Sequence, residues 1–490
     1  MSRPVRTSLS HPLQIATVAA GPGLGAVGVT LCPGKKDPHG LTAAWSRDLD
    51  TDLDALEQWG TAAIVTLMED HELAALQVPR LGPAIHARQL AWYHLPIVDV
   101  SVPGPEFGPA WALARPHLHD LLRSGCNVLL HCRGGLGRSG MIAAQLLAEL
   151  GWEPARAIAA IRKARPGAIE TRAQEAQVRD TVPIAVPPPS TAPDAVADRA
   201  LGAMLGLAIG DAVGTTLEFK PRGSFKPIAD MLGGGPFKLK PGQWTDDTAM
   251  ALALAESLIA KDGLDPKDLM ERFLDWHQTG AYSCTGTCFD IGITTRQALQ
   301  RYRTTGNPIA GSTAPDTAGN GSLMRLAPVA IHARGDKTKA IDLARLQSST
   351  THGAPEARDA CAAFAELLVD AIAGMPKPQL LSPRTGPWGP KVAAIMAGSW
   401  RSKPRGAIAS TGYALHSLEA ALWCTARAAS FKDAILAAAN LGHDADTTAA
   451  ITGQIAGAIH GASAIPQPWC HQLAWAEKIG AVCARLSGAS

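Results

Sequence analysis

The chain has 490 residues, of which 46% are hydrophobic and 18% charged, and its formal net charge is +2. A chain of this length usually has more than one hydrophobic core, so we expect two domains. The composition excludes a disordered chain. Basic residues are scattered along the sequence, which gives no support to a nucleic-acid partner. Nine cysteines without the regular spacing of a disulfide scaffold favour a reducing compartment, and we expect the cytoplasm.

An apolar stretch at residues 13–31 follows a short basic start. Gly21-Pro22-Gly23 and Gly25 interrupt it where the helix of a signal peptide would run, so we interpret it as a strand and a turn. No other uncharged run is long enough to cross a bilayer, and we expect no membrane partner.

Short strand-like runs then alternate with helical stretches such as residues 141–150, the rhythm of an α/β domain. The strand-like runs are 62–67, 92–98 and 127–131. Closely spaced prolines follow, which hold the backbone extended and deny it helical hydrogen bonds. We therefore expect a mixed α/β domain over residues 1–182 and a spacer over residues 183–195.

Beyond the spacer, long Ala- and Leu-rich stretches with helical periodicity replace the strand-like runs. They are residues 249–259, 357–371, 413–429 and 449–459. We expect an all-α second domain over residues 196–490, with Gly- and Asp-rich loops between its helices.

One segment of the first domain has the composition of a covalent phosphatase site. The strand-like run 127–130 leads to Cys132, and five residues separate Cys132 from Arg138, where a helix begins. Glycines between them let backbone N–H groups converge on an anion at the helix N-terminus. The positive electrostatic field of these N–H groups also favours the thiolate form of Cys132, which is the nucleophilic form. Ser139 is placed to donate a hydrogen bond to the sulfur, and the planar guanidinium of Arg138 suits two phosphoryl oxygens. The predicted phosphate-binding loop is Arg133, Gly134, Gly135, Leu136, Gly137, Arg138 and Ser139.

A leaving alkoxide or phenoxide also needs a proton donor from another loop. Asp99 ends a strand-like run and is the candidate general acid. Turn formation explains an Asp at this position equally well, so both interpretations stay open.

These residues resemble the dual-specificity branch of the cysteine phosphatases, in particular the cyclin-dependent kinase-associated phosphatase family. The likeness covers about residues 31–180 and includes Leu31-Cys32-Pro33-Gly34, Pro96-Ile97-Val98-Asp99, the loop itself and Gly167-Ala168-Ile169-Glu170-Thr171. It implies Cys132 as nucleophile, Arg138 as phosphate clamp and Asp99 as general acid. Gln174 would position the water of the second step, and no cofactor is implied. Nothing in this sequence indicates the kinase substrate of that family. A phosphorylated protein and a small phosphomonoester therefore both remain candidate substrates.

Two acidic segments stand out in the second domain. Thr245-Asp246-Asp247-Thr248 and Asp444-Ala445-Asp446-Thr447 each precede a helical stretch. Helix capping explains either one alone. Together they favour metal binding, because adjacent carboxylates repel one another unless a cation lies between them, and hard oxygen ligands favour Mg²⁺ or Mn²⁺ over Zn²⁺.

The second domain closely resembles the ADP-ribosylglycohydrolases of the dinitrogenase reductase-activating type, over nearly all of residues 200–462. Besides the acidic segments, the likeness includes Gly206 to Ala212 with Glu218, Gly319 to Arg325, and His352-Gly353. It implies two divalent ions on Thr245, Asp246, Asp247, Asp444, Asp446 and Thr447. Glu218 would be a ligand or the acid/base group. The ADP-ribose pocket would be lined by Gly286, Asp290, Asn320, His352 and Tyr413.

The sequence therefore predicts an α/β cysteine-phosphatase fold followed by an all-α ADP-ribosylglycohydrolase fold. The expected function is a bifunctional hydrolase that removes ADP-ribose from a modified protein, with arginine the preferred linkage, and also hydrolyses a phosphomonoester. Other ADP-ribose derivatives, including ADP-ribosylated nucleic acid, stay open as substrates. In one alternative, one domain binds phosphate or ADP-ribose without turning it over. In another, the helical domain cleaves a different glycosidic or amide bond.

Overall fold

The computed structural model describes residues 5–40, 43–185, 187 and 190–488. The chain divides near Pro187 into two compact units, and Arg401–Ala407 groups with the first of them. The strands of the first unit are β1 Val5–Arg6, β2 Ala16–Ala19, β3 Ala26–Leu31, β4 Lys36–Asp37, β5 Ala44–Ser46, β6 Thr61–Thr66, β7 Ala91–His94 and β8 Asn127–Cys132. Its helices are α1 Leu49–Gln58, α2 Asp70–Ala75, α3 Leu81–Ala87, α4 Phe107–Arg123, α5 Gly137–Glu149, α6 Pro154–Ala164 and α7 Arg172–Arg179.

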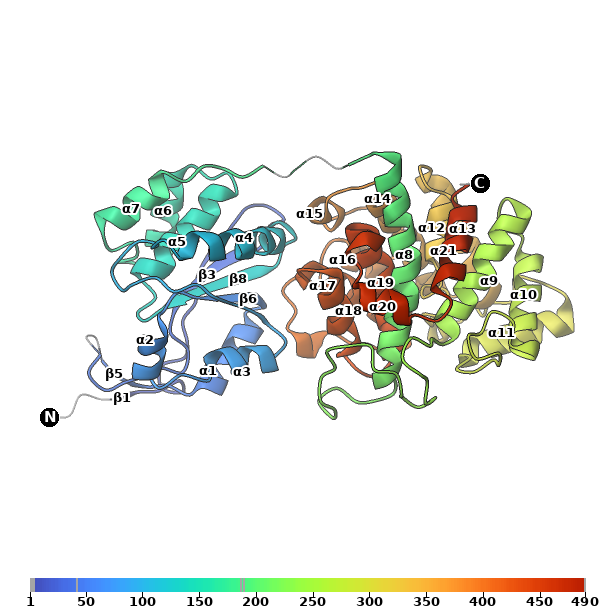
Figure 1. The fold of residues 1–490 in the computed structure, drawn as a ribbon, viewed down its shortest axis with the longest axis horizontal. Helices are drawn as coiled ribbons and strands as arrows, with labels where there is room; N and C mark the ends of the chain where they lie inside the picture. Colours follow the sequence, from blue (N-terminus) through green and yellow to red (C-terminus); the bar gives the residue numbers. More distant parts are fainter. Residues whose placement is uncertain (1–4, 41–42, 186, 188–189, 489–490) are drawn as a thin grey trace. The chain divides into compact units, whose positions relative to one another are not determined.

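A five-stranded sheet in the order β2-β3-β8-β6-β7 forms the centre of this unit. Strands β3, β8, β6 and β7 are parallel, and β2 pairs antiparallel at one edge. Every residue of β6 is buried, as expected for a parallel strand covered on both faces. Helices α4, α5 and α6 cover one face and α1 and α3 the other (Figure 1). The α/β fold expected for the first domain is confirmed.

A second, small sheet has the order β1-β5-β4. Its strands β1 and β5 are parallel, and their register places Arg6 beside Trp45. Strands of two or three residues are too short to carry a period of alternating side chains, so the sequence analysis did not predict this sheet.

Two predicted boundaries differ from the structure. The strand expected at residues 92–98 ends at His94, because Pro96 has no N–H to donate to a neighbouring strand. Helix α8 begins at Pro193, within the predicted spacer. A proline in the first turn of a helix is favourable, since its missing N–H would have no partner there.

Beyond residue 190 the described chain forms helices joined by loops, with three isolated bridge pairs in place of longer strands. Its α-helices are α8 Pro193–Gly214, α9 Asp246–Lys261, α10 Pro266–Thr279, α11 Ile293–Thr305, α12 Ala327–His332, α13 Lys337–Thr351, α14 Pro355–Ile372, α15 Lys377–Leu380, α16 Pro390–Met396, α17 Ala414–Arg427, α18 Phe431–Ala439, α19 Ala445–His460, α20 Gln467–Gln472 and α21 Ala476–Leu486. Short 3₁₀ helices are η1 Thr215–Leu217, η2 Pro315–Thr317, η3 Arg405–Ala407 and η4 Ala462–Ala464. The all-α fold of the second domain is confirmed.

Helices α8 and α19 form the central pair of this unit and touch through their backbones (Figure 1). Glycines recur at every fourth residue of α8, at 202, 206, 210 and 214, along the line of contact. A Cβ at Gly210 would lie 2.1 Å from the carbonyl oxygen of Ala449, and one at Gly206 would lie 2.1 Å from that of Gly453. The absence of side chains here lets the two helices approach as closely as their backbones permit.

Pro193–Leu217, which comprises α8 and η1, is long and apolar enough to cross a membrane, but 89% of its most apolar stretch is buried inside the protein, as expected of a core helix.

Candidate active sites

The loop after β8 carries the predicted nucleophile of the first domain. Cys132 is the last residue of β8, and α5 begins at Gly137. Gly135 has a φ of +69°, and a Cβ there would lie 2.5 Å from the backbone of Thr30 on the neighbouring strand. The hydroxyl of Ser139 lies 3.3 Å from the sulfur of Cys132, as the sequence analysis expected.

Arg138 is held by buried partners on both sides. One guanidinium nitrogen, Nη1, donates to Glu72 at 2.6 Å and to the carbonyl of Ile97 at 2.9 Å, while Nη2 donates to Glu72 at 2.9 Å. Nη2 also lies 2.8 Å from a carboxylate oxygen of Asp99. The Nε atom of Arg138 is buried and has no partner among the described residues. An oxygen of a bound phosphoryl group would satisfy this donor.

Three acidic or amide side chains surround the loop. Asp99 faces Arg138 and is 55% exposed, so its carboxyl reaches both the site and solvent. A Cβ at Gly137 would lie 2.3 Å from the Glu170 carboxylate and 3.0 Å from the Gln174 amide, so both side chains lie against the start of α5. The Gln174 amide accepts from the Glu170 N–H at 2.9 Å and donates to the carbonyl of Ser101 at 3.0 Å.

A cavity of about 910 Å³ opens beside Cys132. Its lining includes Arg133, Gly134 and Leu136 of the loop, together with Asp99. Arg133 points outward from the loop and pairs with Asp37 at 3.2 Å. Three of the predicted loop residues, the nucleophile and the candidate acid therefore border one space.

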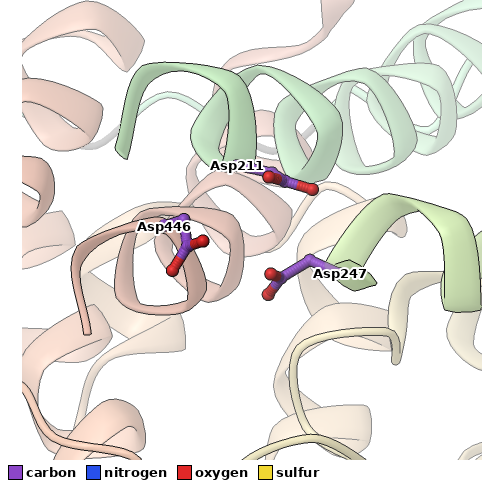
Figure 2. A group of neighbouring side chains, drawn as sticks. All are labelled: Asp211, Asp247 and Asp446. Atoms are coloured by element: carbon purple, nitrogen blue, oxygen red, sulfur yellow. The ribbon is translucent and has the colours of Figure 1, made fainter. Parts of the chain in front are cut away.

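In the second domain, acidic side chains from three helices converge, although they are far apart in the sequence (Figure 2). Carboxylate oxygens of Asp211 on α8, Asp247 on α9 and Asp446 on α19 lie within 4.8 Å of one another. A second group, made of Glu218, Asp444 and Asp446, meets the same criterion. Asp446 belongs to both groups, so the structure brings together two adjacent sets of oxygen ligands.

Asp211 holds the first acidic segment in place. One of its oxygens accepts from the Thr245 N–H at 2.8 Å and from the Thr245 hydroxyl at 2.9 Å. The other accepts from the Thr248 N–H at 3.0 Å and from the Thr248 hydroxyl at 2.7 Å. With four donors bound, Asp211 caps the start of α9 from a neighbouring helix. The Thr245 hydroxyl, a predicted ligand, also lies 3.1 Å from Asp247 and 3.3 Å from Asp446.

Glu218 and Asn320 arrange the second acidic segment. The Glu218 carboxylate accepts from the N–H of Ala445 at 2.7 Å and of Asp446 at 3.3 Å, which satisfies free donors at the start of α19. The Asn320 amide donates to Asp444 at 2.6 Å and to Ser417 at 2.8 Å. Asp444 therefore has a fixed orientation before any cation binds.

Burial and mutual repulsion raise the pKa values of these carboxyls. Burial is the main cause and the charge of Asp446 the next, and they raise the pKa to about 7 for Asp211 and Asp444 and to about 11 for Asp290. The pKa values are also raised for Glu218, Asp246 and Asp247. One oxygen of Asp247 is buried without a hydrogen-bond partner in the described chain. A divalent cation would both compensate the charge and satisfy this oxygen.

A cavity of about 720 Å³ borders the acidic groups. The predicted site residues in its lining are Glu218, Asp246, Asp290, Asn320, His352, Asp444, Asp446 and Thr447. Burial lowers the pKa of His352 to about 3, so its ring is neutral, and Thr351 bonds one ring nitrogen at 2.8 Å. Gly319 and Gly321 lie against the ring, where a Cβ at Gly321 would approach to 2.7 Å.

Two residues predicted for the ADP-ribose pocket do not line the cavity of about 720 Å³. Tyr413 borders a neighbouring cavity of about 500 Å³, where its hydroxyl donates to Glu356 and lies 3.4 Å from the ammonium of Lys391. The two cavities share Gly319 and Gly412 in their linings. Gly286 lines neither of them, and its carbonyl lies against Gly280 at the end of α10.

The sequence analysis missed two residues that hold these sites. Asp211 is the only charged residue between positions 200 and 214 of α8, and a lone carboxylate in an apolar helix was a usable signal. Glu72, the partner of Arg138, carried no such signal, because it lies in a short polar helix distant in the sequence.

Comparisons with known proteins cover both domains. The family described as ADP-ribosylglycohydrolase matches residues 192–490, and the family described as Swiss Army Knife protein, DSP-PTPase phosphatase domain, matches residues 37–178. ADP-ribosylarginine hydrolase Tri1 of Serratia proteamaculans is 46% identical over 300 residues, which are 61% of this chain and 82% of that protein. Cyclin-dependent kinase inhibitor 3 of Rattus norvegicus is 32% identical over 128 residues, which are 26% of this chain and 59% of that protein.

A solved structure of an ADP-ribosylglycohydrolase-related protein complex is 42% identical to this chain, with a TM-score of 0.54. The match covers 61% of this chain and 99% of that one. Both family resemblances drawn from the sequence are confirmed, and both domains belong to hydrolase families. The chain belongs to the ADP-ribosylglycohydrolase family, and its N-terminal domain is a dual-specificity phosphatase domain.

Proposed function

We propose that the second domain removes ADP-ribose from arginine side chains of a modified protein in a metal-dependent reaction, and that the first domain hydrolyses phosphomonoesters through Cys132. The observation that carries the first part is the pair of acidic groups joined at Asp446 beside a cavity of about 720 Å³. The arginine linkage is supported by relatives at 46% and 45% identity that are named ADP-ribosylarginine hydrolases.

The residues present fit divalent cations. Carboxylate and hydroxyl oxygens are the donors that Mg²⁺ and Mn²⁺ prefer, and the unpaired buried oxygen of Asp247 needs a partner. Asp247 and Asp446 would hold one ion, and Glu218, Asp444 and Asp446 the other, with Asp246, Thr245 and Thr447 adjacent. When bound, such ions orient sugar hydroxyls and make a ligated water more acidic.

The protein's own groups contribute positioning. Asn320 orients Asp444, and Asp211 fixes the segment that carries Asp246 and Asp247. The neutral ring of His352 borders the cavity without adding charge beside the substrate. Glu218 is poised to take or return the proton of the attacking water, since its carboxyl faces the same space.

The phosphatase reaction follows from the loop. The Cys132 thiolate attacks phosphorus, so that an S–P bond forms as the ester P–O bond breaks, and Asp99 gives its proton to the leaving oxygen. Water then cleaves the S–P bond, releases phosphate and restores the thiolate. Arg138 stabilises the charge that spreads over the phosphoryl oxygens, and Glu72 holds the guanidinium in that orientation. The nine cysteines all lie in the described part of the chain and form no disulfide there, which supports a reducing location such as the cytoplasm.

The test uses the full chain with arginine-, serine- and nucleic-acid-linked ADP-ribose, with and without a chelator, and with para-nitrophenyl phosphate in parallel. We expect release from arginine, loss of release in chelator, and phosphate ester turnover that chelator leaves unchanged. Asp446→Asn should abolish only ADP-ribose release, and Cys132→Ser only ester hydrolysis. Full activity of both variants in both assays would refute the assignment.

A further inference from the structure

The cavity beside Cys132 is larger than a phosphoryl group requires. Its volume of about 910 Å³ lies at the upper end of the range of about 300–1,000 Å³ that holds whole small molecules. Residues from the N-terminal segments line it together with Cys132, among them Arg6, Lys35 and Trp45. The space therefore accommodates a second part of the substrate next to the reacting phosphate.

Lys35 is a buried ammonium in this lining. It is 6% exposed, and its one hydrogen bond among the described residues is a long contact of 3.4 Å to the carbonyl of Arg133. A lysine ammonium offers three donors, and burying it without an anion is costly. No carboxylate of the described chain lies within ion-pair distance of it, so its charge is available to a ligand.

Cations surround the face of Trp45 in the same wall. The Lys35 ammonium lies 4.9 Å from the ring centre, and the guanidinium carbons of Arg6 and Arg47 lie at 5.5 Å and 5.7 Å. Arg47 is neutralised by Asp52 through contacts of 2.7 Å and 2.8 Å. Arg6 has no ion pair within the described ranges. Asp37, which lines the same cavity and acts on Lys35 electrostatically, pairs directly with Arg133 at 3.2 Å. Among the described residues, Lys35 and Arg6 therefore have no direct ion pair and leave positive charge beside an aromatic face.

We propose that Lys35 and Arg6 form a second anion site in the cavity of Cys132, and that the substrate is a small phosphomonoester with a second phosphate, such as a sugar or nucleoside bisphosphate. This inference rests on the proposed phosphatase function of Cys132. A phosphorylated protein side chain brings one phosphate to the loop and leaves Lys35 buried without an anion. A bisphosphate places one phosphate over Cys132 and the other against Lys35 and Arg6.

The experiment measures kcat/KM of the full chain for adenosine 3′,5′-bisphosphate, fructose 1,6-bisphosphate, their monophosphates, a phosphotyrosine peptide and para-nitrophenyl phosphate. We expect at least one bisphosphate to exceed its monophosphate and the peptide by about tenfold or more. Lys35→Gln should remove that preference and leave para-nitrophenyl phosphate turnover unchanged. Lys36→Gln, at the exposed neighbouring position, is the matched control and should keep the preference.

Calorimetry with Cys132→Ser and its double variant with Lys35→Gln measures the same preference without turnover, and thermal melting confirms that each variant is folded. An equal loss of kcat/KM for all substrates in Lys35→Gln would show that Lys35 only supports the loop. A preference of the wild-type chain for the phosphotyrosine peptide would show a protein phosphatase. Either result overturns the proposal. Failure of the wild-type chain on para-nitrophenyl phosphate would instead refute the phosphatase function, while bisphosphate binding by calorimetry would still decide the anion site.

Discussion

Replacing Gly210 by Ala tests whether the close contact of α8 with α19 holds the acidic site together. The new Cβ would lie 2.1 Å from the carbonyl oxygen of Ala449 and 2.5 Å from its carbonyl carbon. A comfortable contact between such atoms is about 3.5 Å, so the helices must separate locally by about 1–1.4 Å. Both obstructing atoms belong to the backbone of α19 and have no alternative rotamer.

The expected cost follows from two opposing effects. Overpacking of this kind costs about 1–3 kcal/mol, and a rigid backbone obstacle argues for the upper end. Alanine in place of glycine inside a helix stabilises the folded state by about 1 kcal/mol, because alanine has the higher helix propensity. The net loss of about 2 kcal/mol should lower the Tm of the second domain by about 4–8 °C. Because Asp211 is the next residue, a shift of about 1 Å should also lower ADP-ribose release by about tenfold to a hundredfold.

Scanning calorimetry of the full chain measures the Tm, and a release assay at saturating Mn²⁺ measures activity. The matched control is Gly480→Ala in α21, where the nearest atom to the new Cβ, in Leu201, lies 4.0 Å away. That variant should be as stable as the wild type or more so. An unchanged Tm and activity in Gly210→Ala would refute the reasoning.

Three further predictions concern charge at the two sites. Arg138→Lys should lower para-nitrophenyl phosphate turnover by about a hundredfold, because an ammonium cannot reproduce the two-point contact with Glu72, and should leave ADP-ribose release unchanged. Adding Mn²⁺ to chelator-treated protein at a hundred times its Kd should stabilise the second domain by about 2.7 kcal/mol, seen as a rise in Tm that Asp446→Asn abolishes. In chelator, the pKa of Asp211 and of Asp444 is about 7 in the folded state, whereas the pKa of an unfolded Asp is about 4. Between these two pH values the folded state keeps protons that the unfolded state has lost. The Tm of the second domain in chelator should therefore fall as the pH rises from 4 to 7, and it should keep falling above pH 7 because the pKa of Asp290 is raised to about 11. A rise in Tm between pH 4 and pH 7 would contradict this account.

The parts of the fold that the sequence predicted are those with a long, regular pattern. The buried run at 127–131 became β8, and the apolar period at 449–459 became part of α19. The small sheet of β1, β5 and β4 was missed because its strands have two or three residues. The predicted spacer overlaps the first residues of α8 because prolines were interpreted only as helix breakers.

The same distinction applies to the sites. The Cys132 loop and the two acidic segments could be predicted because each is a continuous motif whose glycines, acids and hydroxyls act together. Glu72, Asp211 and Lys35 act on groups that are distant in the sequence, and only the folded chain brings them there. The separation of Tyr413 from the cavity that holds Asn320 is also a property of the tertiary packing.

The pairing of α8 with α19 also orders the events of biosynthesis. Asp446 lies more than two hundred residues after Asp211 in the sequence. The two side chains can therefore meet only when almost all of the second domain has left the ribosome. Until then, the glycine-lined side of α8 lacks the helix that covers it. The phosphatase domain, whose last helix α7 ends at Arg179, completes its own core earlier. The residues of the Cys132 loop are therefore all synthesised before the acidic groups of the second domain are complete.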